Sequence, residues 1–153
     1  MRLGIGLPAA VPDADMTLLG RWAVEAERGG FESVGVIDRL VYDNLDPLTA
    51  LAAAAATTSR IGLTSTVVNV CWRNNPVLLA KQLSSVARLS GGRDGQPRIT
   101  CPRGLTSPDH LLAELGRLSQ AGCDEVVLFP SSGALVQIAL LSDALQGAAK
   151  ACA

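Results

Sequence analysis

Asp38 and Arg39 directly follow a short apolar stretch, where a buried strand would end. A carboxylate in such a place can act as a general base or orient a ligand. The two neighbours can equally form a structural ion pair, and the sequence leaves both interpretations open. Asp38 and Arg39 are therefore the candidate catalytic residues, with proton transfer as the candidate chemistry.

A second polar group follows another apolar stretch, in the segment TSTVVN. Hydroxyl and amide groups at a strand end suit the polar edge of a bound ring. The candidate cofactor-binding residues are therefore Thr64, Ser65, Thr66 and Asn69. Ordinary β-branched strand residues followed by a turn would give the same pattern, so that alternative stays open.

Small residues precede a helical stretch in the segment PSSGAL. Free backbone N–H groups and the helix dipole favour a phosphate at such a helix start. This makes Ser131, Ser132 and Gly133 candidate cofactor-binding residues. The segment lacks the lysine and the spacing of a P-loop.

Metal and thiol chemistry is poorly supported by the sequence. The four cysteines show no CxxC spacing, and His110 is the only histidine. We predict no metal site, and we expect reduced thiols in a cytoplasmic protein. His110 falls in the first turn of an expected helix, where a solvated or capping role is favoured over catalysis. The net charge of −1 and the lack of a long apolar run argue against nucleic-acid and membrane partners.

Five short apolar stretches alternate with five amphipathic ones, and the 153 residues are expected to form one α/β domain. The expected strands are residues 2–8, 33–38, 61–68, 98–101 and 124–130. The expected helices are residues 13–30, 45–60, 74–92, 106–122 and 134–149. Because the steps are about 30 residues long, we predict five parallel (βα) units. They can form a partial TIM barrel or a flavodoxin-like open parallel sheet, and in both folds ligands bind at the carboxyl ends of the strands.

Local signals mark the expected helices. Asp46, Asn75 and Ser107 each stand before a proline, which is typical of an N-cap followed by the first helical position. Within residues 74–92, helical spacing predicts a buried face made of Leu79, Leu83 and Val86.

Residues 31–93 carry a more specific pattern, in FESVGVID, DPLTALAAAAATTSRIGL and NPVLLAKQLSSVARLSGGR. These segments resemble the luciferase-like monooxygenase superfamily, which contains bacterial-luciferase relatives and flavin- or F420-dependent oxidoreductases. RLGIGLP is similar to the first strand of that family, and TSPDHLLAELGRLSQAGCDEVVLFP to its penultimate helix and last strand. The resemblance implies a (βα)8 barrel and an oxidoreductase that uses FMN or coenzyme F420.

A barrel of this kind typically needs about 250 residues. The resemblance therefore assigns residues 1–93 to the first three (βα) units and 97–153 to the last two. Residues 92–97 become a deletion joint, natural or engineered, at which strands 4 to 6 are missing. The family's cofactor ring would lie near Thr64–Val67, and Arg39 replaces the histidine of an Asp-His pair common in the family.

Two functions remain open at this point. One is a truncated luciferase-like oxidoreductase that acts on a small molecule with weak or no activity. The other is a non-catalytic binding or assembly remnant, or a designed partial barrel. Because strand edges and an apolar sheet face would be exposed, we expect either form to associate as a homodimer.

Overall fold

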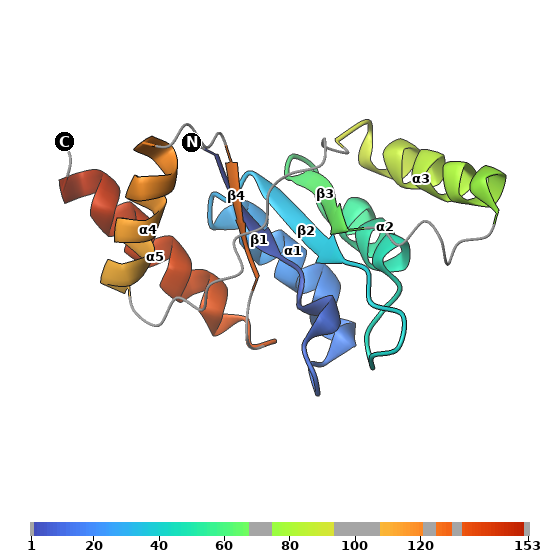
Figure 1. Ribbon diagram of the computed structural model, residues 1–153, viewed down its shortest axis with the longest axis horizontal. Coiled ribbons are helices and arrows are strands. Elements are labelled where there is room, and N and C mark those ends of the chain that lie inside the picture. The colour runs from blue at the N-terminus through green and yellow to red at the C-terminus, as the bar shows by residue number, and fades with distance from the viewer. Residues whose placement is uncertain (1, 68–74, 94–107, 121–124, 130–132, 152–153) are drawn as a thin grey trace.

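The computed structural model describes residues 2–67, 75–93, 108–120, 125–129 and 133–151. Four parallel strands of the described chain form one sheet, in the order β3-β2-β1-β4 (Figure 1). Their bounds are Arg2–Gly6 for β1, Ser33–Ile37 for β2, Gly62–Val67 for β3 and Glu125–Leu128 for β4. The C-terminal strand β4 therefore lies beside the N-terminal strand β1, as the closing strand of a barrel does.

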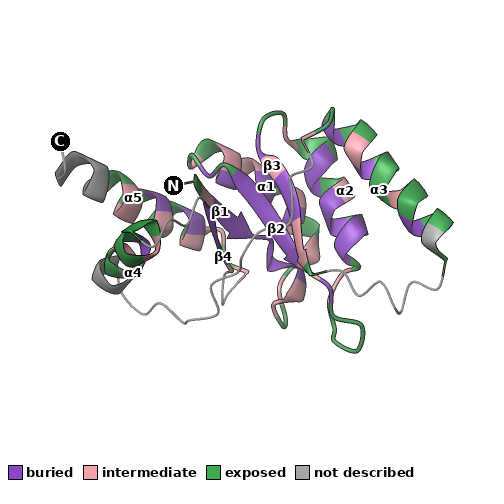
Figure 2. Ribbon diagram, turned by 45° about the horizontal axis from the view of Figure 1, so that its top comes forward, coloured by how far each residue is buried: buried purple, intermediate pink, exposed green. Residues whose placement is uncertain are grey.

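Helices connect these strands. They are the short 3-10 helices η1 (Pro8–Ala10) and η2 (Met16–Leu18), followed by α1 (Leu19–Arg28), α2 (Pro47–Thr57), α3 (Pro76–Ser90), α4 (Pro108–Gln120) and α5 (Val136–Ala151). The steps from β1 to β2 and from β2 to β3 run in one direction, so right-handed crossovers place their helices on one face of the sheet. The main core agrees with this arrangement, because buried side chains of β1, β2 and β3 pack against α1, α2 and α5 (Figure 2).

One-sided helices and this strand order correspond to a partial TIM barrel. A flavodoxin-like sheet would show strand order 2-1-3 and helices on both faces, so that alternative is not the fold observed. Four of the five predicted strands are present, and the expected strand at 98–101 lies outside the described residues.

The predicted helix starts are confirmed where the structure describes them. The Asp46 side chain accepts hydrogen bonds from the second and third N–H groups of α2, and Asn75 does the same in α3, each at 3.0 Å. Ser107 lies outside the described residues. The helix expected from residue 13 begins only at Leu19, because Asp15 caps the short η2 turn first by accepting from the N–H of Thr17.

The predicted buried face of α3 is wrong in one position. Leu79 and Val86 are buried, but the Leu83 side chain is 43% exposed. Among the described elements, α3 packs mainly against α2 and lies at the outer end of the helix layer (Figure 1). Leu83 therefore has no second helix to cover it within the described chain.

The segment that ends α3 fixes the start of β3. Gly91 and Gly92 adopt φ values of +67° and +83°, a region that other residues rarely enter. They turn the chain back so that the Arg93 guanidinium donates to the carbonyl groups of Ala55, Thr58 and Ile61. The Arg93 carbonyl in turn accepts from the N–H of Leu63 at 2.9 Å. The family-like LSGGR phrase thus ties the end of α2 and the end of α3 to β3.

Glu27 of α1 stabilises the segment that leads into β3. Its carboxylate accepts hydrogen bonds from the backbone N–H groups of Ser59, Arg60 and Ile61 at 3.1, 2.6 and 2.8 Å. Burial by itself raises the pKa of Glu27, but these N–H donors together outweigh it and hold the pKa below its ordinary value. The ionised carboxylate is therefore part of the folded structure.

Replacing this carboxylate tests its contribution. We expect Glu27→Gln to lower the free energy of unfolding at pH 7 by about 1–3 kcal/mol, because a neutral amide accepts more weakly. Since the folded pKa is the lower one, the stabilisation is complete above the ordinary pKa of 4.5 and is lost as the pH falls through the folded value. In urea unfolding, the difference between wild type and variant should shrink below pH 4.5.

Glu25→Gln is the matched control for this change, because Glu25 pairs with Arg28 on the exposed side of the same helix. An exposed pair of this kind contributes about 0–1 kcal/mol. Equal losses in the two variants, or a Glu27 effect that persists unchanged in acid, would contradict the assignment.

Gly4 of β1 allows side chains of β2 and β4 to meet on the inner face of the sheet, which is the face turned away from the helices. A Cβ atom at Gly4 would lie 3.0 Å from Val127 Cγ2 and 3.1 Å from the Ser33 carbonyl oxygen. In its absence, the Ser33 hydroxyl donates to Glu125 Oε1 at 2.7 Å and joins β2 to β4 across β1.

We expect Gly4→Ala to lower the free energy of unfolding by about 1–3 kcal/mol, as overpacking does. The matched control is Gly116→Ala in α4, where an added Cβ would meet nothing within 4 Å. There the same methyl group should stabilise the helix by up to about 1 kcal/mol. Urea unfolding measures the free energy of unfolding of both variants. If both substitutions change it in the same direction, the packing described for Gly4 is contradicted.

Candidate functional site

The carboxyl ends of the strands bring together the predicted catalytic carboxylate and the predicted ring-binding segment. Asp38 directly follows β2 and is 6% exposed. Its backbone N–H donates to the carbonyl oxygen of Val67, at the end of β3, at 3.2 Å. Asp38 therefore lies beside the Thr64–Thr66 segment, at the edge of the sheet where ligands of such folds bind.

The end of β3 contains a bulge. Val36 pairs with Ser65 and Ile37 with Val67, so Thr66 is the extra residue. The Thr66 hydroxyl donates to the Val36 carbonyl at 3.0 Å, and the Ser65 hydroxyl donates to the Val67 carbonyl at 3.0 Å. Both protons are used within the fold, and the Thr66 oxygen has lone pairs that can accept from a ligand N–H.

The three hydroxyl residues do not share one face of the sheet. Thr64 is buried and contacts the inner side of Gly35, where a Cβ would lie 3.3 Å from Thr64 Cγ2. Ser65 pairs with Val36, which belongs to the core between the sheet and the helices. Because paired residues point to the same side, Ser65 faces the helix layer and Thr64 faces the barrel interior.

The Arg39 side chain contacts the ring of Tyr42. Its guanidinium carbon lies 5.0 Å from the centre of the Tyr42 ring, a cation–π arrangement. The loop that carries both residues also exposes Leu40 and Val41, the latter at 90%. Arg39 and Tyr42 thus stabilise an exposed apolar loop at the rim of the site.

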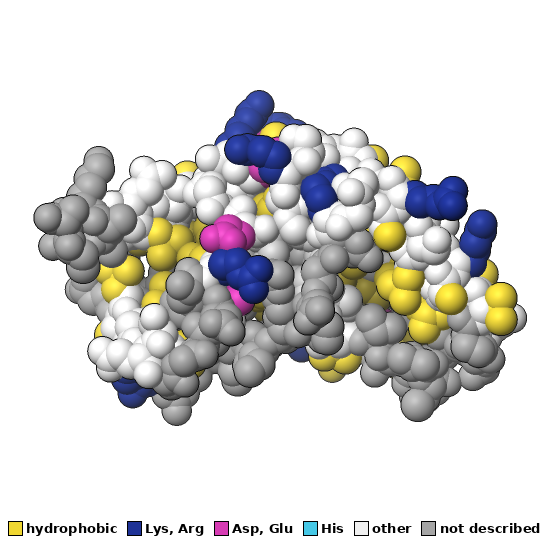
Figure 3. Space-filling model, turned by 90° about the horizontal axis from the view of Figure 1, so that it is seen from above, with side chains coloured by type: hydrophobic (Ala, Val, Ile, Leu, Met, Phe, Trp, Pro, Cys, Tyr) yellow, Lys and Arg dark blue, Asp and Glu magenta, His cyan; other side chains and the backbone are white. Residues whose placement is uncertain are grey.

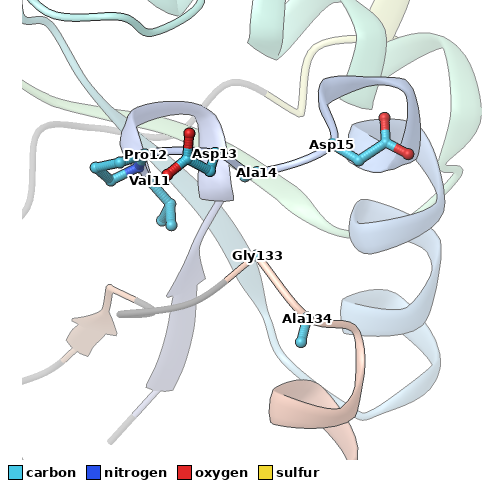
Figure 4. Close-up of a pocket in the computed structure, with 7 residues that line it drawn as sticks. All are labelled: Val11, Pro12, Asp13, Ala14, Asp15, Gly133 and Ala134. Carbon is cyan, nitrogen blue, oxygen red and sulfur yellow. The ribbon is translucent and has the colours of Figure 1, made fainter.

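A pocket of about 390 Å³ lies beside the β1 and β4 ends (Figure 4). The segment Val11–Asp15 passes over Gly133 and Ala134 there, so closely that a Cβ on Gly133 would lie 2.7 Å from Ala14 Cβ. Asp13 and Asp15 line this pocket. Hydrogen bonds from the Thr17 side chain and backbone lower the pKa of Asp15, which keeps it ionised. The negative charge of Asp13 and Asp15 in this lining disfavours a phosphate in the pocket.

The other predicted phosphate-binding residues, Ser131 and Ser132, lie outside the described residues, and so does Asn69. The described part of the chain contains no group of three or more His, Cys, Asp or Glu side chains that could hold a metal ion. None of its helices is both long enough and apolar enough to cross a bilayer.

The opposite end of the sheet, where the strands begin, carries charged side chains that form structural contacts. In the view from above, Lys and Arg side chains are spread across the face, and Asp or Glu side chains lie beside some of them (Figure 3). One of these contacts joins Arg2 Nε to Glu125 Oε2 at 3.6 Å. The amino ends of barrel strands serve stability in enzymes of this architecture.

Phe129 is the site residue that the sequence analysis missed. It follows β4 directly and is half-buried. A Cβ on Gly6 would lie 2.7 Å from its ring carbon Cε1, and a Cβ on Gly35 would lie 3.6 Å from its Cζ. The alternating glycines of RLGIG were the available signal, because Gly4 and Gly6 have no side chain on the inner face of β1 and so make room for an aromatic ring.

A sequence model described as luciferase-like monooxygenase matches residues 1–94, more than half of the chain. The chain belongs to the luciferase-like monooxygenase family. The matched residues include the strands β1 to β3 and the helices α1 to α3 of this chain.

Individual relatives support the assignment. The N-acetyl-S-(2-succino)cysteine monooxygenase of Bacillus subtilis (strain 168) is 35% identical over 104 residues, which are 61% of this chain and 23% of that protein. The crystal structure of monooxygenase RslO1 from Streptomyces bottropensis has a TM-score of 0.53 at 29% identity, with 81% of this chain and 40% of that chain covered.

A second solved structure is similar to this chain in fold only. It is the oxygenating constituent of 3,6-diketocamphane monooxygenase from Pseudomonas putida, a type II Baeyer-Villiger monooxygenase in complex with FMN. Its TM-score is 0.53 at 19% identity, with 74% of this chain and 32% of that chain covered. The chain thus spans less than half the length of each of these three luciferase-like proteins.

Proposed function

We propose that this chain is a flavin-dependent oxidoreductase of the luciferase-like type that binds FMN at the carboxyl ends of its strands. The observation that carries the proposal is the meeting of buried Asp38 with the bulged end of β3, in a chain of this family. The FMN found with the diketocamphane enzyme supports FMN as the first choice of cofactor, and F420 is the second.

The described residues fit the ring of a flavin. An isoalloxazine ring has apolar faces and a polar edge, so it needs an apolar wall beside hydrogen-bonding groups. Phe129 supplies apolar surface at the end of β4, and Thr64 reaches the same inner face from β3. The hydroxyl oxygen of Thr66, whose proton is donated to Val36, can accept from a ring N–H.

The described residues do not fit the phosphate of FMN equally well. Gly133 is the one predicted phosphate-binding residue in the described chain, and Asp13 and Asp15 line the pocket beside it. The resemblance to the family likewise implies that the phosphate end is bound mainly by segments that correspond to strands 4 to 6. Binding is therefore proposed to depend mainly on the ring.

The protein's own part in the reaction follows from Asp38 and Arg39. When bound, a reduced flavin supplies the electrons for oxygen or hydride chemistry. Asp38 is a buried carboxylate that can accept a proton from a small-molecule substrate at the strand ends. The Arg39 guanidinium supplies positive charge at the rim, and because a guanidinium has donors but no acceptor, it cannot replace a histidine as a proton acceptor.

We also propose that two copies associate. Val77, Leu78, Leu83 and Leu89 of α3 are between 43% and 76% exposed. Hydrophobic side chains gather over this helix in the view from above (Figure 3). Exposed apolar side chains are stabilised when they are covered, and a homodimer would cover some of these with a second copy of the helix.

A non-catalytic binding or assembly role is the second candidate. It is favoured by the acidic lining of the pocket beside Gly133, which does not suit the phosphate of FMN. A chain with this role would have the same fold and the same exposed apolar side chains on α3, but it would not bind a flavin.

Titration with FMN and with riboflavin, followed by flavin fluorescence, separates these functions. We expect FMN and riboflavin to bind with dissociation constants within about fivefold, a difference of about 1 kcal/mol, because the ring carries most of the affinity. Size-exclusion chromatography with light scattering and visible absorbance gives the mass and the bound flavin in the same run.

Co-elution of flavin with a dimer supports the proposed function. Failure to bind FMN, riboflavin or F420 would contradict it and leave the assembly role. FMN binding more than about a hundredfold tighter than riboflavin, near 3 kcal/mol, would show that a phosphate site exists and that the ring is not the main contact.

A further inference from the structure

The inner face of the sheet has an unusual row of residues at its carboxyl end. Register pairs Gly6 of β1 with Gly35 of β2, and Gly35 with Thr64 of β3. Phe129 follows Leu128, the partner of Ile5, and so completes this row from β4. In this row, two glycines, which have no side chain, thus separate an aromatic ring from a threonine.

The Phe129 ring extends across these glycines. Its Cγ and Cε1 atoms come within 2.8 and 2.7 Å of the place that a Gly6 Cβ would occupy, and its Cζ approaches Gly35. Any larger residue at position 6 would force the ring away. Phe129 is nevertheless not fully buried, although Gly6 and Gly35 beside it are.

The chain's only other phenylalanine behaves differently. Phe31 is 5% exposed and belongs to the core between the sheet and the helices. A purely structural role would favour burial of Phe129 as well. An aromatic residue left partly exposed at the ligand-binding end of a barrel is suited to hold a planar group.

We propose that Phe129 is the residue against which the flavin ring stacks, and that it positions the ring's polar edge toward Thr64 and Thr66. This inference rests on the proposed function and adds the residue that orients the cofactor. The ring spans β1 at Gly6 and reaches β2 at Gly35, so it can support a planar group over these two positions, which carry no side chain. Thr64, at the other end of the same row, limits how far the group extends toward β3.

Nuclear magnetic resonance of protein carrying isotope-labelled phenylalanine tests the contact without any substitution. The two phenylalanines give two sets of ring signals, which Phe31→Leu assigns. On addition of FMN, ring currents from the stacked isoalloxazine should shift the Phe129 signals and leave those of Phe31 in place.

Substitution gives the second measurement. We expect Phe129→Leu, which keeps an apolar side chain but removes the ring, to weaken FMN binding about tenfold. Phe129→Tyr should retain binding, because it keeps the aromatic face. Phe31→Leu should lower stability and leave the FMN dissociation constant unchanged, which separates a general loss of packing from loss of the stacking contact.

The outcomes distinguish this inference from the proposed function. If the wild type binds FMN while the Phe129 signals do not move, or move together with those of Phe31, the stacking contact is wrong and the function stands. Equal affinity of Phe129→Leu and wild type leads to the same conclusion. If the wild type binds no flavin, both proposals are overturned.

Discussion

The hydrogen bond from Ser33 to Glu125 is the contact on which the arrangement of the sheet depends. It joins residues 92 positions apart in the chain at 2.7 Å, over the backbone of Gly4. A buried carboxylate is costly unless it is hydrogen-bonded or paired. Glu125 therefore favours the one placement of β4 in which Ser33 can donate to it, and that placement is beside β1.

Further contacts support the same placement from the helix side. The Ser142 hydroxyl of α5 donates to the Gly29 carbonyl at the end of α1, at 2.9 Å. Val126 and Leu128 of β4 pack against Leu115 of α4. The C-terminal part of the chain is thus attached to the family-matched part by polar contacts at defined points and by a small apolar core. Only in this attachment does Phe129 reach the ends of β1 and β2.

The position of β3 is set by charge rather than by apolar packing alone. Glu27 accepts from the N–H groups that precede the strand, and Arg93 donates to the carbonyl groups at the same corner. Two opposite charges bound to backbone groups fix where β3 begins. Its carboxyl end, with the Thr66 bulge, then lies beside Asp38. The geometry of the candidate site therefore depends on contacts at the opposite end of the sheet.

Features encoded by neighbouring residues could be predicted from the sequence. Asp46 and Asn75 before prolines identified two helix starts, and the apolar stretches identified four strands. Contacts between distant residues could not be predicted in this way. The role of Phe129 depends on Gly6 and Gly35, which lie far earlier in the chain, and the exposure of Leu83 depends on which helices lie beside α3. The Thr66 bulge arises from the pairing of β3 with β2, which spacing along the chain does not reveal.

A double-mutant cycle between Ser33→Ala and Glu125→Leu tests the central claim, that β4 docks beside β1 through this contact. Hydrogen bonds to charged groups contribute about 1.5–3 kcal/mol, so the account predicts a coupling free energy of at least about 1 kcal/mol in urea unfolding. If the two single effects add to within about 0.5 kcal/mol, the residues do not interact, and the placement of β4 described here is contradicted.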